Sequence, residues 1–546
     1  MFVISKTTDA QVLIRFYIEE LKLPVKSIHS YRLGEEYQLF WTNVRAVDNL
    51  TVYKNGFVIG KVAFNQPHSD HPYDYKDMEI PSDINPLLNF VVVKKNDRGW
   101  KIEPGEQGAI YYSGEAISDY TLLLALLHGV SPDRYGVGML VATGYFIANA
   151  TLFSAIKRVK YLHGITLPEM SEYRCADFEP VVNNDREMIR HLVSLLPVDI
   201  KASISLSGGM DSRFVLGLLT KKSIVPNAYT LPSEETGLVE DICKHLHLKL
   251  HVQRADGMHN FQYTLRTDAR IYSSGGNYHK MIHEFMPDHY IFNGLCAEPA
   301  LKNVYSSVWK DFRVKKTEVI NQIIALVYLG DVCEEIKGVN IRKSELKQKY
   351  KELFSDLTIM AESLKKHEIT RLFNHFNRSL NWVQAHTMDL SYTIYPLFLL
   401  ANKRAVELGI RSPLYNNLYA DRLRRMNVSL LPGCNVNYSG NRPFNGKSFL
   451  IRDIYKIYHE YFSRVFVYLK NRNEGRKGGR ISERTRFELE EGKGFEQYFT
   501  HPLNELLSRP EVRKNTKRAA LTVNNVLLLS EKYRVYRNDI IANQSH

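Results

Sequence analysis

The stretch that says most about this chain reads IKASISLSGGMDSRFVLGLLT and covers residues 200–220. Apolar and polar residues alternate over 202–206, as in a short β-strand. The turn at 207–212 carries two glycines and an aspartate, which are typical turn residues. Apolar residues then recur at helical spacing over 214–219. A strand, a turn and a helix in this order predict one unit of a parallel α/β sheet.

The turn has the chemistry of a phosphate-binding loop. Gly208 and Gly209 let the backbone approach an oxyanion closely, and the free amides at a helix N-terminus favour negative charge there. Ser207 and Ser212 add hydroxyl donors. Asp211 would repel phosphate unless a cation lay between them, so we expect it to bind Mg²⁺. The alternative is an ordinary β–α turn with an N-capping Asp or Ser, and no Walker A motif is present.

The motif S-G-G-x-D-S resembles the pyrophosphate loop of the N-type ATP pyrophosphatases, and its surroundings are similar to the asparagine synthetase branch of that family. NAYTL (227–231) looks like the family's second parallel strand, whose backbone reads the adenine, and 234–253 looks like the following helix and third strand. The resemblance implies ATP and Mg²⁺ as cofactors, and it adds Leu206 and Leu231 to the nucleotide-binding residues. It also implies an α/β fold with a parallel-sheet ATP pyrophosphatase (adenine nucleotide α-hydrolase-like) domain.

The N-terminal part has a different pattern. Residues 30–120 contain short alternating segments separated by turns such as 54–56 and 96–99, which predict antiparallel sheet. GEQGAIYYS (105–113) and the stretch 144–164 resemble the end of the family's N-terminal glutaminase-like domain.

A working glutaminase of this family needs a cysteine at position 2, with its N-terminal amine as base. Here that residue is Phe2, and Cys175 is the first cysteine of the chain. We therefore exclude glutamine hydrolysis by that mechanism and expect a degenerate glutaminase-like domain, either a structural remnant or a docking surface. In lacking this cysteine the chain is similar to β-lactam synthetases and lasso-peptide cyclases, which form an amide with an amine that does not come from glutamine hydrolysis.

Other family positions are only partly matched. Glu298 falls at the second magnesium-binding aspartate, so it is either a metal ligand or an exposed loop acid. Leu295 replaces a residue that is often a catalytic Glu or Tyr, and leucine cannot transfer a proton. Tyr392 stands where a glutamate is usual and is either a polar substitute in catalysis or a core tyrosine with a satisfied hydroxyl.

Two basic residues are weaker candidates. Lys447 is the nearest match to the lysine that the family uses on the leaving pyrophosphate, although its spacing to the next family residues is off by one. Its alternative is a solvated lysine at a helix start. Arg213 follows the loop and could touch phosphate, but we expect it on an exposed helix face.

Length and composition set the frame for these motifs. The 546 residues include 44% hydrophobic and 24% charged residues, which excludes disorder, collagen and coiled coil over most of the chain. We expect a degenerate glutaminase-like domain at 1–165, a connection at 165–185, an ATP pyrophosphatase domain at 180–450 and a basic helical extension at 451–546. The net charge of +13 suggests an anionic partner.

The cysteine spacing and the absence of a long uninterrupted apolar stretch indicate the cellular compartment of the protein. The five cysteines lie far apart without a C-x-x-C pair, which favours a reducing compartment. Between Arg134 and Lys157 no charge occurs, but glycines and polar residues interrupt the stretch, so we expect a helix, a turn and a short second helix rather than a membrane span. We expect a cytoplasmic protein.

These observations lead to three hypotheses. The first is an ATP-dependent, amide-forming ligase that activates a carboxylate as an acyl-adenylate, with an amine or ammonia as acceptor. The second is a non-catalytic nucleotide-binding descendant. The third is an RNA-modifying enzyme with the same loop, which the absence of a cysteine pair makes the weakest, so nucleic acid is not the expected partner. A homodimer or a biosynthetic partner protein is left open.

Overall fold

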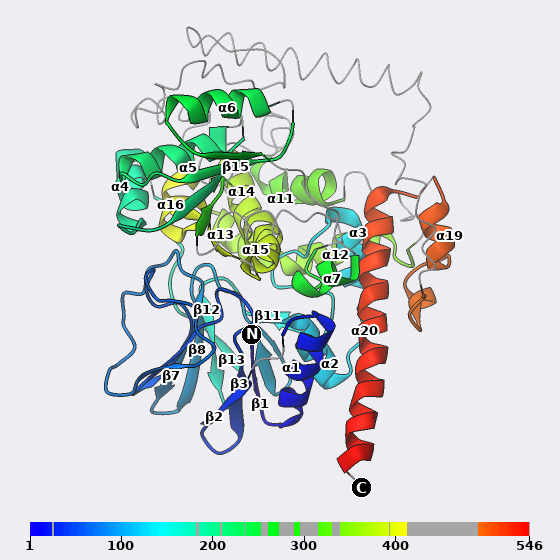
Figure 1. The fold of residues 1–546 in the computed structure, drawn as a ribbon. Helices are drawn as coiled ribbons and strands as arrows, with labels where there is room; N and C mark the ends of the chain where they lie inside the picture. The colour runs from blue at the N-terminus through cyan, green and yellow to red at the C-terminus, as the bar shows by residue number, and fades with distance from the viewer. Residues whose placement is uncertain are drawn as a thin grey trace, which may run out of the picture.

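The computed structural model describes residues 1–24, 27–181, 185–207, 210–233, 235–252, 260–271, 289–294, 315–329, 339–392, 394–411, 490–510 and 512–544. It is a mixed α/β structure, with antiparallel sheets in the sandwich part (1–174) and a parallel sheet in the parallel-sheet part (185–411) (Figure 1). This confirms the predicted α/β class with antiparallel strands first.

Two sheets form the sandwich part. The six-stranded sheet has the order β11 (Lys157–Arg158), β9 (Tyr111–Ser113), β10 (Ala116–Ser118), β1 (Phe2–Ser5), β3 (Tyr37–Trp41) and β2 (His29–Leu33). The seven-stranded sheet has the order β13 (Ser171–Arg174), β12 (His163–Leu167), β8 (Gly99–Pro104), β7 (Phe90–Asn96), β5 (Gly56–Gly60), β4 (Leu50–Tyr53) and β6 (Tyr73–Tyr75). All neighbours are antiparallel except β4 and β6. The β4–β5 and β7–β8 hairpins close at the two turns predicted from the sequence.

The facing sides of the two sheets share one hydrophobic core. Ile4 and Leu39 of the six-stranded sheet and Val93 and Ile102 of the seven-stranded sheet are fully buried in it. Alternate residues of each strand point to this core because successive side chains of a strand face opposite ways.

Two local expectations are wrong. The connection expected at 165–185 begins later, because β12 and β13 form a hairpin that joins β8 in the seven-stranded sheet. The hairpin is short and its edge strand is partly exposed, so it lacks the alternation by which longer strands are recognised. Over 134–157 the structure contains one helix, α3 (Arg134–Thr143), and no second helix follows it there.

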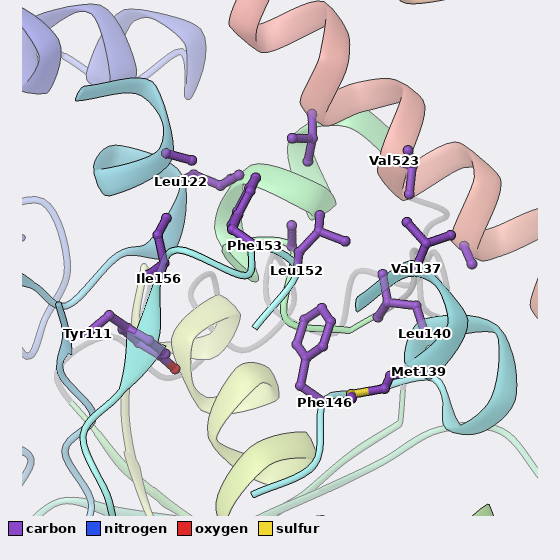
Figure 2. Packing of buried hydrophobic residues seen from close by; sticks show 14 of the residues in the cluster. Tyr111, Leu122, Val137, Met139, Leu140, Phe146, Leu152, Phe153, Ile156 and Val523 are labelled. Atoms are coloured by element: carbon purple, nitrogen blue, oxygen red, sulfur yellow. The ribbon is translucent and has the colours of Figure 1, made fainter. Parts of the chain in front are cut away.

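Helices cover the outer side of the six-stranded sheet. They are α1 (Asp9–Glu20), α2 (Thr121–His128), α3 and the long C-terminal helix α20 (Lys514–Gln544). Figure 2 shows Val137 and Leu140 of α3 beside Val523 of α20 in this core. The end of the chain therefore packs against its beginning. None of the helices in the described ranges is both long and apolar enough to cross a membrane.

The parallel sheet has five strands in the order β16 (Leu250–Val252), β15 (Asn227–Thr230), β14 (Ala202–Ser205), β17 (Tyr290–Phe292) and β18 (Tyr395–Leu397). Every neighbouring pair is parallel, as predicted. The helices α4 (Asp185–Leu195), α5 (Met210–Lys221), α6 (Thr236–His245) and α16 (Lys403–Ile410) share its hydrophobic core. The remaining helices in the described residues are α7 (Asn260–Arg266), α11 (Val319–Ile323), α12 (Lys343–Leu353), α13 (Ser355–Ala361), α14 (Lys366–Phe373), α15 (Gln384–Ser391) and α19 (Leu503–Ser508). The segments η2 (Ile324–Tyr328) and η3 (Asn374–Val383) are π-helical, and η1 (Lys316–Glu318), η4 (Leu399–Ala401) and η6 (Phe495–Gln497) are 3₁₀ turns.

A half-buried carboxyl group of the sandwich part lies at the start of a helix of the parallel-sheet part. Glu106 Oε2 accepts hydrogen bonds from the Lys403 backbone N–H at 2.7 Å and from Asn402 Nδ2 at 2.8 Å, at the start of α16. Burial raises the pKa of Glu106 to about 7, although both hydrogen bonds and the Lys403 charge act in the opposite direction. Glu407 on the same helix adds to the rise.

We predict that the raised pKa of Glu106 makes the stability of the protein depend on pH. The folded protein binds a proton at Glu106 more tightly than the unfolded chain, so the stabilisation is complete below about pH 4.5 and lost above about pH 7. Relative to Glu106→Gln, the free energy of unfolding of the wild type should fall by up to about 3 kcal/mol across this range. Urea denaturation at pH 5, 6, 7 and 8 measures it. The exposed control Glu35→Gln should follow the wild type, and a constant difference between wild type and Glu106→Gln contradicts the prediction.

Candidate functional site

The turn at 207–212 follows the strand at which the order of the parallel sheet reverses. β14 pairs with β15 on one side and with β17 on the other, and the chain proceeds outward in both directions from this pair. At such a point the loops diverge and leave a crevice at the carboxyl ends of the strands, where open α/β sheets bind ligands. The turn therefore lies at the edge of the sheet where a ligand is expected.

The hydroxyl of Ser212 holds the turn closed. Ser212 Oγ accepts a hydrogen bond from the Ser207 backbone N–H at 3.1 Å and lies 3.1 Å from Ser207 Oγ. It also donates to Ser207 O at 3.3 Å. Ser212 is buried and Ser207 is exposed, so Ser212 shapes the turn and Ser207 forms its outer surface. Gly208 and Gly209 lie outside the described residues.

The segment after β17 packs directly on the start of α5. A Cβ atom at Gly294 would lie 2.6 Å from the Ser212 backbone nitrogen and 2.8 Å from Asp211 Cβ. Only a glycine allows the two segments to come this close. The segment that leads from β17 toward Glu298 therefore touches the start of α5 at Gly294, next to the half-buried Asp211.

The two leucines of the expected nucleotide site lie at the same edge. Leu206 follows β14, is buried, and donates its backbone N–H to a carbonyl of β15 at 3.0 Å. Leu231 follows β15 and is half-buried. The structure thus brings Leu206 and Leu231 to the edge that carries the turn.

Several candidates lie elsewhere or outside the described residues. Leu295, Glu298 and Lys447 fall in parts of the chain that the structure does not describe, so their roles stay predictions. The exposed position expected for Arg213 is wrong, because its side chain is fully buried. All residues over 212–219 are buried, so α5 is covered on every side and offers no solvent-facing stripe at this point.

Tyr392 is not brought to the turn. It follows α15 and precedes β18, so it lies at the amino end of its strand, whereas the turn follows the carboxyl end of β14. Its hydroxyl lies 2.6 Å from the Tyr120 hydroxyl, and the Arg266 guanidinium lies 5.4 Å from its ring centre. Burial raises the pKa of Tyr392. These contacts are those expected of a core tyrosine with a satisfied hydroxyl.

Sequence reasoning missed a cluster of buried charges in the sandwich part. The Met1 ammonium group lies 2.6 Å from Asp48 Oδ2, and Arg45 Nη2 lies 2.5 Å from Asp48 Oδ1 and also bonds Asp119. Burial alone would raise the pKa of Asp48, but the positive charges of Arg45 and Met1 lower it. The i, i+3 spacing of Arg45 and Asp48 was the only signal in the sequence.

Phe2 is part of this region and is built into the core. Its side chain is 1% exposed between the two sheets, and its backbone N–H donates to Asp119 Oδ1 at 2.9 Å. A cavity of about 40 Å³ adjoins Phe2 and Arg45 and is also lined by Gln107 and Met388. The position at which a glutaminase would carry its nucleophile is therefore filled by a packed aromatic ring.

The described ranges contain no group of three or more His, Cys, Asp or Glu side chains arranged to hold a metal ion. Asp211 stands in the first turn of α5, and a Mg²⁺ ion there would also take oxygen atoms from a bound phosphate and water, as is usual for this ion.

We predict that Gly294→Ala disturbs the turn. The added methyl group would meet the backbone of Ser212, so α5 or the segment after β17 must shift, at a cost of about 1–3 kcal/mol. Gly237→Ala in α6 is the matched control, because a Cβ there meets nothing within 4 Å. Urea denaturation of the two variants measures the difference, and equal stabilities would show that the close contact is unimportant.

Comparison with models of protein families finds none that matches this chain, and comparison with curated proteins finds no match either. The function proposed below therefore depends on the residues and geometry of the chain itself.

Proposed function

We propose that this chain is an ATP-dependent ligase that activates a carboxylate as an acyl-adenylate, releases pyrophosphate and forms an amide. The observation that carries the proposal is the Ser207–Ser212 turn at the start of α5, placed where the strand order reverses and packed against Gly294. The strand order of the parallel sheet, with β14 at its centre, also supports the finer inference of an ATP pyrophosphatase-type domain.

The turn supplies the groups that such a reaction needs. Backbone N–H groups at the start of a twelve-residue helix favour the phosphate anion, because they point toward it and the helix dipole is positive at this end. The substrate carboxylate would attack the α-phosphorus of ATP, the turn would hold the departing pyrophosphate, and an amine or ammonia would then displace AMP. Asp211, with Glu298 as a further candidate, would hold Mg²⁺, which offsets the charge that develops on the phosphates.

The alternative is a descendant that binds nucleotide without catalysis. Phe2 is packed in the sandwich core, and Tyr392 bonds Tyr120 at the amino end of its strand. At positions 2 and 392 the family carries reactive groups, whereas here Phe2 and Tyr392 make contacts within the folded core. Because the turn is independent of both, nucleotide binding would survive the loss of catalysis.

We predict that the purified protein exchanges labelled pyrophosphate into ATP when the correct carboxylate is present. Asp211→Asn should lower the exchange rate at least about 100-fold, because the charge of the phosphates is no longer offset. Asp241→Asn, an exposed aspartate of α6, is the matched control and should keep the wild-type rate. Exchange that survives in Asp211→Asn would show that the turn is not the reacting site.

We predict that ATP with Mg²⁺ binds the wild type and that Asp211→Asn weakens the binding at least about tenfold. Calorimetric titration measures both. Binding without exchange for any carboxylate favours the non-catalytic descendant, and absence of binding at millimolar nucleotide contradicts both proposals.

The RNA-modifying hypothesis is tested by a filter-binding assay. An affinity for RNA that falls steeply with salt would support that hypothesis.

A further inference from the structure

The connecting segment (175–181) leads from the sandwich part toward the parallel-sheet part and is held in place near its end. The backbone N–H of Glu179 donates to Glu407 Oε1 at 2.8 Å, and the backbone N–H of Val181 donates to Glu407 O at 3.2 Å. One step earlier in the chain, the half-buried side chain of Phe178 packs against the π-helical segment η3. Backbone bonds to α16 and one aromatic ring therefore hold the segment.

The ring of Phe178 lies on the imidazole ring of His375 in η3. The two rings are stacked, with their centres 6.0 Å apart and an angle of 14° between their planes. The rings of Tyr161 and Phe376 meet the imidazole edge-on, with their centres 5.3 and 5.4 Å from its centre. His375 is 0% exposed. Three aromatic rings thus enclose the imidazole, and that of Phe178 belongs to the connecting segment.

Neither ring nitrogen of His375 has a hydrogen-bond partner among the described residues. A protonated imidazole in this place would lose its hydration and gain no acceptor in return, which is costly for a buried charge. The positive charge of Arg158 would oppose it as well. Burial, and to a smaller extent Arg158, lower the pKa of His375 to about 3. The closed arrangement of the segment therefore requires a neutral imidazole.

Other charged side chains on the packed elements are bonded elsewhere or exposed. Arg371, four residues before His375, donates to the carbonyl oxygens of residues 409 and 410, and Arg378, three residues after it, lies 5.5 Å from the Trp382 ring. The rest lie beside Tyr161, in the connecting segment and on α16: Lys157, Lys160, Asp177, Glu179 and Glu407. None of these carboxylates bonds His375, so a proton on its ring has no acceptor from them.

We propose that His375 makes the joint between the two parts of the molecule sensitive to acid. When the imidazole gains a proton, Phe178 leaves its ring and the connecting segment separates from η3 and α16, so that water reaches the charged ring. The closed form binds the proton more weakly than the open form, so a fall in pH through the range in which a solvated imidazole is protonated shifts the population toward the open form. This device is independent of the proposed ligase reaction.

Hydrogen–deuterium exchange of the full chain, followed by mass spectrometry, tests the proposal. The bonded amides of Glu179 and Val181 report the opening of the segment, and their rates at each pH are divided by the intrinsic exchange rate. A solvated imidazole has a pKa of about 6.5, so the opening constant should rise about tenfold between pH 7.5 and pH 5.5. Equal protection of these amides at the two pH values overturns the proposal.

Variants show whether the acid response belongs to His375. His375→Phe keeps an aromatic ring against Phe178 but binds no proton, so its protection should differ less than about twofold between the two pH values. His375→Gln also lacks the titrating ring and is smaller, so it gives the same test if the Phe variant does not fold. His245→Phe, the same change at an exposed histidine of α6, should keep the wild-type response. A tenfold response that persists in a folded His375 variant belongs to another group, such as Asp177 or Glu179, and overturns the proposal.

Discussion

The carboxylate of Asp268 joins the two parts of the molecule by completing a helix that belongs to the other part. It accepts hydrogen bonds from the backbone N–H groups of Thr121 and Leu122 at 2.7 and 2.9 Å, in the first turn of α2. Asp268 is fully buried, so a small shift between the parts would break these bonds at a place that water does not reach. Burial raises the pKa of Asp268, and Arg270 and the α2 amides act against that rise.

At Glu106 the roles of the two parts are exchanged, because here the sandwich part supplies the acceptor for the first turn of α16. Each part therefore supplies an acceptor for the first turn of a helix of the other part, and a sliding motion would leave backbone N–H groups of both helices without these acceptors. Lys61 Nζ adds a bond to the Tyr290 hydroxyl at 2.9 Å, and the Asn89 backbone N–H donates to the Tyr395 hydroxyl at 2.9 Å. The strands β17 and β18 are thus fixed against the sandwich, and the turn after β14 is built on a rigid sheet.

The parts of the fold that could be predicted from the sequence are those that depend on near neighbours. The strand, turn and helix at 200–220 were predicted because alternation, glycine and helical spacing follow one another within a few residues. The hairpin of β12 and β13 was missed, because short strands at a sheet edge carry little alternation. The burial of Arg213 was also missed, since the spacing of apolar residues on α5 cannot show that other elements cover its polar face. Asp268 and Thr121 are 147 residues apart, and no local pattern connects them.

The surplus of positive charge is concentrated in one stretch of the sequence. Fifteen Lys or Arg and six Asp or Glu lie in 412–489, so this stretch holds +9 of the net +13. Two buried arginines of the described residues are paired with carboxylates, Arg45 with Asp48 and Arg270 with Asp268. Lys447, the lysine whose sequence context resembles a pyrophosphate contact, belongs to the same stretch. A stretch with this charge attracts anions, so under the proposed function its lysines and arginines would act on ATP, pyrophosphate or an acidic substrate.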